Sequence, residues 1–351
     1  MIATKISPMN SSKFISTLKK LCSINSPSGY TIEINDYLKG VFDEFSINYT
    51  ESNKGSILVP FSDAPELVVT AHVDTLGAMV KEIREDGWLG ISLIGGYSFN
   101  SIEGEYVTVR NSNGKLFRGT FLLNNPALHV NKDFSSQKRD AANMGIRLDE
   151  EVFNDTEVDK LGIEVGDYVF FDHRFEVTDN GFIKSRYLDD KACAAIMIEL
   201  ILENKNELKD KPIAFYFSNY EEVGHGSTMG IPRSAKELLV LDMAVVGYGC
   251  KGSETKVSIC AKDSSGPYDY SMTTSLKHLA KQNNLDFVID IYPFYGSDGS
   301  AALLSGYDIK VALIGPGVSA SHGLERTHIK GLENTTKLAQ AYLMNFLNHN
   351  K

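Results

Sequence analysis

Long apolar runs alternate along the chain with segments whose apolar residues recur at helical spacing. Residues 11–23 carry Phe14, Leu18 and Leu21 three or four positions apart, which predicts a helix. The run ELVVTAHVD is nearly continuous in apolar residues, as is typical of a strand covered on both faces of its sheet. Further helices are predicted near 31–45, 188–203, 267–282 and 332–347, and further strands in SILVP, PIAFYFSN, LLVLDMAVV, TKVSICAK, DFVIDIYP and IKVALIG. This alternation predicts an α/β fold with a mostly parallel central sheet flanked by helices on both faces.

The pattern changes between residues 77 and 178, where the apolar runs become short and alternate with polar residues. EYVTVRNSNGKLFRGTF contains two such runs, and the dipeptide Asn113-Gly114 between them is a strong signal for a hairpin turn. We therefore expect a small β-rich domain at 77–178, inserted into an α/β catalytic domain made of 1–76 and 179–351.

The charge and the cysteines narrow the classes of protein that the chain can belong to. The formal net charge of −10 over 351 residues argues against a nucleic-acid-binding protein, whose surface would be basic. The four cysteines form no CxxC pair, the N-terminal segment has no apolar core of signal-peptide length, and no apolar stretch could span a bilayer. We expect a cytoplasmic protein with reduced thiols and with neither nucleic acid nor membrane as a partner.

Acidic and imidazole side chains stand at several predicted strand ends and at one helix start. They are His72 and Asp74 in TAHVDT, Asp189 and Asp190 in YLDDKA, Glu221 and Glu222 in NYEEVG, Asp242 in LDMA, and His322 in SASHGLE. Ligands of open α/β sheets bind beyond the carboxyl ends of the strands, so these segments can converge in space. Two imidazoles and several carboxylates suit Zn²⁺ or Co²⁺.

The adjacent pair Glu221-Glu222 indicates that positive charge lies nearby, because two neighbouring carboxylates beyond a buried strand repel each other and are costly to desolvate. A pair of divalent cations would supply that charge. One glutamate would bind metal, and the other would stay free to carry a proton. Each motif alone has a simpler explanation, such as a helix N-cap at Asp189-Asp190 or a solvated strand end at Glu221-Glu222. Only the joint order of the motifs favours a metal site.

That order, with the loop GSDGSAA and the segment ASHGLERTH, resembles the co-catalytic metallopeptidases. The closest resemblance is to the glutamyl/deblocking aminopeptidase family, which includes the tetrahedral aminopeptidases, and it covers almost the whole chain. It implies a zinc-exopeptidase-like fold in which the inserted domain serves dimerisation or acts as a lid.

The resemblance also implies two divalent metal ions per subunit, Zn²⁺ or Co²⁺, and a set of ligands for them. His72 and Asp242 would bind one ion, and Glu222 and His322 would bind the other. Asp189 would bridge the two ions and would be joined to the next residue by an unusual peptide bond.

Three further roles are implied for acidic residues. Glu221 would be the general base, and Asp74 would hold and polarise His72 from behind. Asp298 would contribute to the pocket for the substrate's amino group, and its alternative role is to cap the helix that begins near Gly299.

The function implied is a metal-dependent aminopeptidase that acts on short peptides and self-associates as a dimer-based dodecamer. Thr75, Lys191 and Ala192 stand where the family usually has Glu, Arg and Gly. A related di-metal amidohydrolase therefore stays open, either an N-acyl amino acid deacylase or a hydrolase of a small dipeptide-like metabolite. A non-catalytic, self-assembling shell protein is the alternative of another class. The preferred substrate side chain stays open, and Lys251, Lys262 and Arg326 are candidates for an acid-binding pocket by charge alone.

Overall fold

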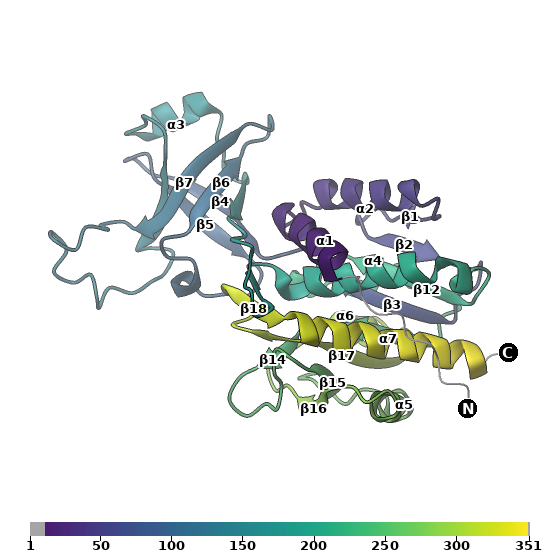
Figure 1. Ribbon diagram of the computed structural model, residues 1–351. Helices are drawn as coiled ribbons and strands as arrows, with labels where there is room; N and C mark the ends of the chain where they lie inside the picture. The colour runs from purple at the N-terminus through teal and green to yellow at the C-terminus, as the bar shows by residue number, and fades with distance from the viewer. Residues whose placement is uncertain (1–10, 350–351) are drawn as a thin grey trace. The chain divides into compact units, whose positions relative to one another are not determined.

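The computed structural model describes residues 11–349, and it divides the chain into two compact units (Figure 1). The first, here called the α/β unit, runs to Asp74 and resumes at Arg174. The second, here called the barrel unit, is Thr75–His173. No helix of the described residues is long and apolar enough to cross a membrane.

The α/β unit is built on one large sheet with a parallel centre. Its strands are β1 (Thr50–Glu51), β2 (Ile57–Pro60), β3 (Leu67–His72), β10 (Glu176–Val177), β11 (Phe182–Ser185), β12 (Ile213–Ser218), β13 (Glu237–Leu241), β14 (Ala244–Val246), β15 (Val257–Lys262), β16 (Phe287–Ile291), β17 (Lys310–Ser319) and β18 (Glu325–His328). The main path is β1-β2-β12-β3-β13-β17-β18-β11-β10, with β14 and β15 also pairing with β17, and β16 pairing with β15.

The central strands β12, β3, β13 and β17 are parallel, and antiparallel pairs flank them, as β2 does on β12. Their carboxyl ends therefore meet at one edge of the sheet. All six residues of β3 are buried, as the continuous apolar run predicts for a strand with both faces covered. The predicted mostly parallel sheet is confirmed, and its antiparallel flanks are an addition that the strand patterns did not reveal.

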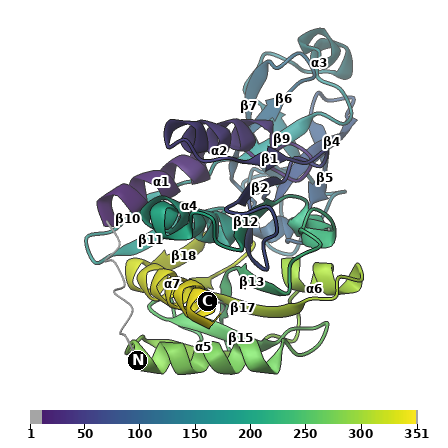
Figure 2. The same ribbon diagram turned by 90° about the vertical axis from the view of Figure 1, so that its right-hand side faces the viewer.

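Helices cover both faces, unequally. They are α1 (Ser11–Ser23), α2 (Ile32–Glu44), α4 (Leu188–Leu208), α5 (Tyr270–Gln282), α6 (Asp298–Leu304) and α7 (Ile329–His349). Leu67, Val69 and Ala71 of β3 pack in one core with α1, α2, α4, α5 and α7, whereas Val68 points into a second core that includes Ala302 of α6. Figures 1 and 2 show α4 running between α1 and α7.

The helix α4 is buried almost all round, from Leu188 through Ile201, because neighbouring helices and the sheet enclose it. It begins with the carboxylates Asp189 and Asp190, whose peptide bond is cis as the resemblance implies. The helix therefore holds two buried acidic side chains at its start. The helix α5 starts at Tyr270 instead of Pro267, because Asp269 caps it by accepting from the amide of Met272.

The barrel unit is a closed six-stranded barrel with its own apolar core. Its strands are β4 (Gly77–Ile83), β5 (Leu89–Ile94), β6 (Tyr106–Arg110), β7 (Leu116–Leu123), β8 (Met144–Leu148) and β9 (Tyr168–Phe171), with α3 (Asp155–Leu161) beside them. The order β4-β5-β8-β7-β6-β9 closes because β9 pairs back onto β4. The hairpin predicted at Asn113-Gly114 joins β6 to β7, and Gly114 takes the positive φ of +82° that such a turn requires.

Candidate metal centre

The predicted ligands gather at the carboxyl edge of the central strands, within the α/β unit. His72 is the last residue of β3, and Asp242 directly follows β13. Glu221 and Glu222 form the short 3₁₀ turn η2 (Glu221–Val223) beyond β12. Asp189 comes from the start of α4, and His322 follows β17. Three elements and two loops thus each bring one side chain or one pair of side chains to the same place.

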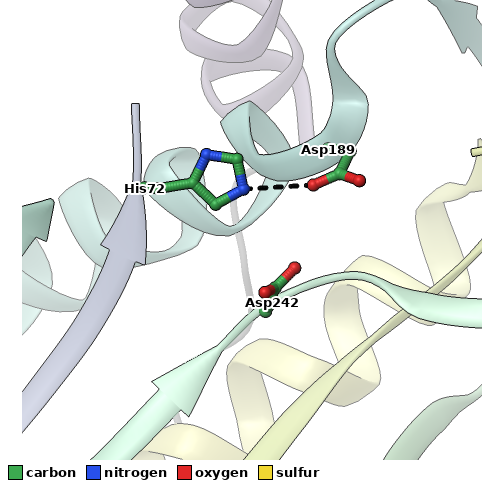
Figure 3. Close-up of side chains that lie close together, drawn as sticks. All are labelled: His72, Asp189 and Asp242. Atoms are coloured by element: carbon green, nitrogen blue, oxygen red, sulfur yellow. Dashed lines mark hydrogen bonds and ion pairs between the residues drawn. The ribbon is translucent and has the colours of Figure 1, made fainter. Parts of the chain in front are cut away.

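Two groups of potential ligand atoms share Asp189. The atoms of His72, Asp189 and Asp242 all lie within 4.8 Å of one another, and so do those of Asp189, Glu222 and His322. One carboxylate oxygen of Asp189, Oδ1, lies 3.2 Å from His72 Nε2, and the other, Oδ2, lies 3.4 Å from His322 Nε2. Figure 3 shows the first group, with His72 and Asp242 pointing from neighbouring strand ends toward Asp189. Asp189 therefore belongs to both groups and directs one carboxylate oxygen toward the imidazole of each.

The protonation of His72 tests whether a cation fits the first group. Its Nδ1 lies 2.9 Å from the backbone carbonyl of Asp74, which can only accept a hydrogen bond, so Nδ1 carries a proton. Its Nε2 faces an oxygen of Asp189, which as a carboxylate is also only an acceptor. A neutral imidazole cannot donate from both nitrogens, so this contact requires either an imidazolium or a cation at Nε2. A ring held through Nδ1–H by a carbonyl is the usual arrangement of a metal-binding histidine.

The pKa values of the acidic side chains also indicate that a cation would bind at the site. Burial raises the pKa values of Asp190, Glu221, Glu222 and Asp242 well above their usual range, and neighbouring carboxylates raise them further. Burial also acts to raise the pKa of Asp189, but the hydrogen bonds from His322 and His72 outweigh it and lower the net pKa. This concentration of buried acid groups favours cationic ligands.

One buried oxygen of the second group has no protein partner. Glu222 Oε2 lies 3.5 Å from His322 Nε2, whereas Glu222 Oε1 is buried without a hydrogen bond from any described residue. A buried carboxylate oxygen without a hydrogen-bond donor is costly unless it binds a cation. The donors are imidazole nitrogens and carboxylate oxygens, which suit a divalent metal ion.

Asp74 differs in detail from the role that the resemblance implies. Its carbonyl holds the imidazole of His72, whereas its carboxylate lies 3.6 Å from that ring. The carboxylate accepts instead from the hydroxyl of Ser28 and from the backbone amides of Glu221 and Glu222, at 3.1 and 3.3 Å for the amides. Asp74 therefore fixes the turn that carries both glutamates as well as the histidine.

Asp298 lies close to the site but faces away from its open space. Its side chain is 1% exposed, and its oxygens accept from the hydroxyls of Thr70 and Ser218 and from the amide of Ser227. The cap of α6 is Ser297, whose hydroxyl accepts from the amide of Gly299, so the predicted capping by Asp298 is wrong by one residue. These contacts fasten α6 to β3 and β12.

Glu325 is a site neighbour that the sequence patterns did not single out. It is 2% exposed, and its two carboxylate oxygens accept from the backbone amides of Asp189 and His322, each at 3.1 Å. Burial, and then the charge of Asp189, raise its pKa to about 8. The only signal in the sequence was an acidic residue three positions after His322.

The backbone around the site is strained at non-glycine residues. Tyr187, Tyr220, Ala320 and His322 all have positive φ values, between 57° and 71°. Three of them precede Asp189, Glu222 and His322 by two positions, and the fourth is His322 itself. Such conformations cost about 1–3 kcal/mol each and gather at functional sites.

A cavity of about 580 Å³ opens beside the cluster. Its lining includes Asp189, Glu221, Glu222, Asp242 and His322, but not Asp298. Glu221 is in neither group of candidate ligands, and its Oε2 lies 3.7 Å from His72 Nε2. A carboxylate outside both ligand groups therefore lies beside the cluster and lines a space large enough for a peptide end.

Comparison with known proteins identifies the family. The sequence model of the M42 glutamyl aminopeptidase family matches residues 55–338. A protein of Bacillus subtilis named putative aminopeptidase YhfE is 46% identical over 336 residues, which are 94% of this chain and 97% of that protein.

Solved structures share the fold. A TET aminopeptidase from a marine sediment archaeon of the Thaumarchaeota superposes with a TM-score of 0.83 at 20% identity, covering 94% of this chain and 96% of that one. The TET1 peptidase of Pyrococcus horikoshii, described as assembling into a tetrahedron or a large octahedral shell, has a TM-score of 0.81 at 22% identity, covering 93% and 98%. The predicted family and enzyme class are confirmed: the chain belongs to the M42 glutamyl aminopeptidase family and is a hydrolase that acts on peptides.

Proposed function

We propose that the protein is a metal-dependent aminopeptidase that removes N-terminal residues from short peptides with two divalent cations, Zn²⁺ or Co²⁺. The observation that carries this proposal is the position of Asp189, which directs one oxygen toward each of two imidazoles. His72 and Asp242 would hold one cation, and Glu222 and His322 the other, with Asp189 shared. When bound, the cations would lower the pKa of a water molecule and polarise the scissile carbonyl.

Glu221 is the proton carrier in this proposal. Its carboxylate lines the cavity, lies outside both ligand groups and is fixed through its backbone amide by Asp74. It would accept the proton of the attacking water and deliver it to the leaving amine. Burial raises the pKa of Glu221, which makes it a stronger base than a solvated carboxylate.

The carboxylates of the cavity also explain why a chain end would be the substrate. Asp189, Glu221, Glu222 and Asp242 place negative charge in one enclosed space. Because three of these carboxylates would hold the cations, a peptide's amino terminus would lie near the second cation or beside the carboxylate of Glu221. Asp298 is left out of the proposed amine site, because its oxygens already accept three hydrogen bonds.

We further propose self-association through the inserted domain at 77–178, with a dimer-based dodecamer as the assembly. The support comes from relatives of the same fold, among them a Pyrococcus horikoshii structure described as a dodecamer. A shell of that kind would admit short peptides and exclude folded proteins. The cytoplasmic location stays a prediction.

The substitution Glu221→Gln tests the mechanism. It removes the proton acceptor and leaves the ligands in place, so kcat should fall by about 10²–10⁴-fold. Metal content, measured by atomic emission spectroscopy, should stay at the wild-type value of two ions per chain. The matched control is Glu176→Gln, which changes an exposed carboxylate paired with Lys184 and should leave turnover unchanged.

Near wild-type turnover of Glu221→Gln would remove this residue from the role of base. The substrate panel should contain aminoacyl-anilides and N-acyl amino acids side by side. Hydrolysis of the acyl substrates alone would replace the proposed aminopeptidase by the related amidohydrolase.

A further inference from the structure

Beyond the ligand cluster, six apolar side chains line the main cavity together with four serines and three glycines. The apolar side chains are Met243, Val245, Phe294, Tyr295, Ala301 and Leu304. Ala301 and Leu304 stand three positions apart on α6 and so share one face of the helix. Tyr295 is fixed by its hydroxyl, which donates to the carbonyl of Met243 at 2.8 Å. This wall comes from three separate segments.

Two of these side chains are unusually exposed for their type. Phe294 is 97% exposed and Leu304 is 82% exposed, and both stand at the lining of the same cavity. Large apolar groups that are exposed together beside a cavity are typical of a surface that binds an apolar ligand. Their continuity with Asp189 and Glu222 in one cavity places such a ligand next to the catalytic cluster.

Within residues 11–349, the cavity lining has no permanently cationic side chain, and its one imidazole, His322, belongs to the proposed ligand cluster. The lining residues of the described chain include four carboxylates and no lysine or arginine. The three basic residues that the sequence offers for an acid-binding pocket are engaged elsewhere or lie outside the lining. Lys262 donates to the carbonyl of Asp263, Arg326 pairs with Glu254, and Lys251 is not a lining residue.

A substrate with a glutamate or aspartate at its N-terminus would bring a further carboxylate into this space without a cationic side chain to meet it. The two proposed cations would lie in the ligand cluster, where the four carboxylates offset their charge, and burying a carboxylate against the apolar wall without a cationic partner is strongly unfavourable. An aliphatic or aromatic side chain would instead cover the apolar wall and displace water from it. The two effects favour the same class of substrate.

We propose that the enzyme prefers peptides with an apolar N-terminal residue, such as Leu, Met or Phe, and discriminates against acidic ones, with Phe294 and Leu304 as specificity-determining residues. This inference rests on the proposed aminopeptidase function. The proposed preference for apolar N-terminal residues differs from the glutamyl preference named in the family's description.

The first experiment compares kcat/KM for Leu-, Met-, Phe-, Lys- and Glu-anilides with the metal-loaded full chain. Leu or another apolar residue should exceed Glu by about 100-fold or more, the discrimination expected when a charge has no partner in the pocket. A preference for Glu, or for Lys through Asp263 of the small neighbouring cavity, would overturn the inference while leaving the aminopeptidase function in place.

Two substitutions then test the named residues. Phe294→Ala should lower kcat/KM for the Leu substrate by about 10-fold. The control is Tyr248→Ala, which removes an exposed aromatic side chain that does not line the cavity and should leave kcat/KM unchanged. Leu304→Lys should lower the Leu-to-Glu ratio of kcat/KM by about 10-fold or more. Ser305→Lys puts the same charge one residue further on, outside the lining, and should leave the ratio unchanged.

Light scattering of the same variants separates selectivity from assembly. If Phe294→Ala and Leu304→Lys change the particle mass but not the substrate ratio, the exposed apolar groups are a subunit interface and the inference is wrong. If no anilide is hydrolysed, the proposed function fails, and calorimetry of Glu221→Gln with Leu-Ala and Glu-Ala decides the inference alone. Tighter binding of Leu-Ala supports the apolar preference, and equal or weaker binding overturns it.

Discussion

Substituting Glu325 should loosen the metal centre although this residue is not one of the proposed ligands. Its two oxygens hold the backbone amides of Asp189 and His322, and these two residues belong to the second ligand group. Glu325→Ala removes both acceptors at once. Glu325→Gln keeps one oxygen but turns an NH₂ group toward the second amide.

The size of the effect follows from the burial of these groups. A buried donor left without an acceptor costs about 1–3 kcal/mol. Glu325→Gln orphans one amide, so the free energy of unfolding should fall by about 1–3 kcal/mol. Glu325→Ala orphans two amides, of Asp189 and His322, and should cost about 2–6 kcal/mol by the same reasoning. Loss of such a supporting contact typically weakens metal affinity by about 10–100-fold.

Two assays measure these quantities. Urea denaturation of the metal-free chain gives the free energy of unfolding, and competition with a chromophoric chelator gives the zinc affinity. The neighbouring Arg326→Gln is the control, because its half-exposed ion pair with Glu254 should contribute at most about 1 kcal/mol. If Glu325→Ala binds zinc as tightly as the wild type, Glu325 does not position the ligands and the reasoning is refuted.

Three other perturbations have definite expected results. Removal of divalent cations with a chelator should abolish peptide hydrolysis and lower Tm, and Zn²⁺ or Co²⁺ should restore both; full activity in the chelated protein would contradict the metal dependence. In Gly315→Ala the new Cβ would lie 1.6 Å from the carbonyl oxygen of Asp242. The free energy of unfolding, measured by urea denaturation, should therefore fall by at least about 3 kcal/mol, and the metal content should fall as well. In the control Gly247→Ala the new Cβ has no atom within 4 Å, so this variant should behave as the wild type. Asp298→Asn should reduce the free energy of unfolding by about 1.5–3 kcal/mol with KM for peptides unchanged, and a raised KM at unchanged stability would return this residue to the amine site.

The sheet and the ligand segments could be predicted because both depend on short-range patterns. A buried parallel strand is a continuous apolar run, and β3 and β12 show it in full. Polar side chains directly after such runs stand at the carboxyl edge in any fold of this class. The hairpin at Asn113-Gly114 is equally local, since its turn lies between Arg110 and Leu116.

The contacts that refine the site could not be predicted, because they join residues that lie far apart in the chain. The carboxylate of Asp74 meets an amide 147 positions away, and Glu325 meets one 136 positions away. Asp298 was associated with its own helix start, but its partners Thr70 and Ser218 come from two strands elsewhere in the sheet. The periodicity of apolar residues does not reveal contacts between residues that lie far apart in the chain. The antiparallel pairing of β15 with β17 has the same cause.

The order in which the ribosome delivers these segments has a consequence for the living cell. His72 emerges early, whereas His322 follows 250 residues later (322 − 72), after the strand β17 that separates β13 from β15. A growing chain therefore lacks both the strand that joins β13 to β15 and the second proposed histidine ligand until most of the message has been translated. The proposed peptidase would stay inert beside other nascent polypeptides, and hydrolysis would begin only with a finished fold.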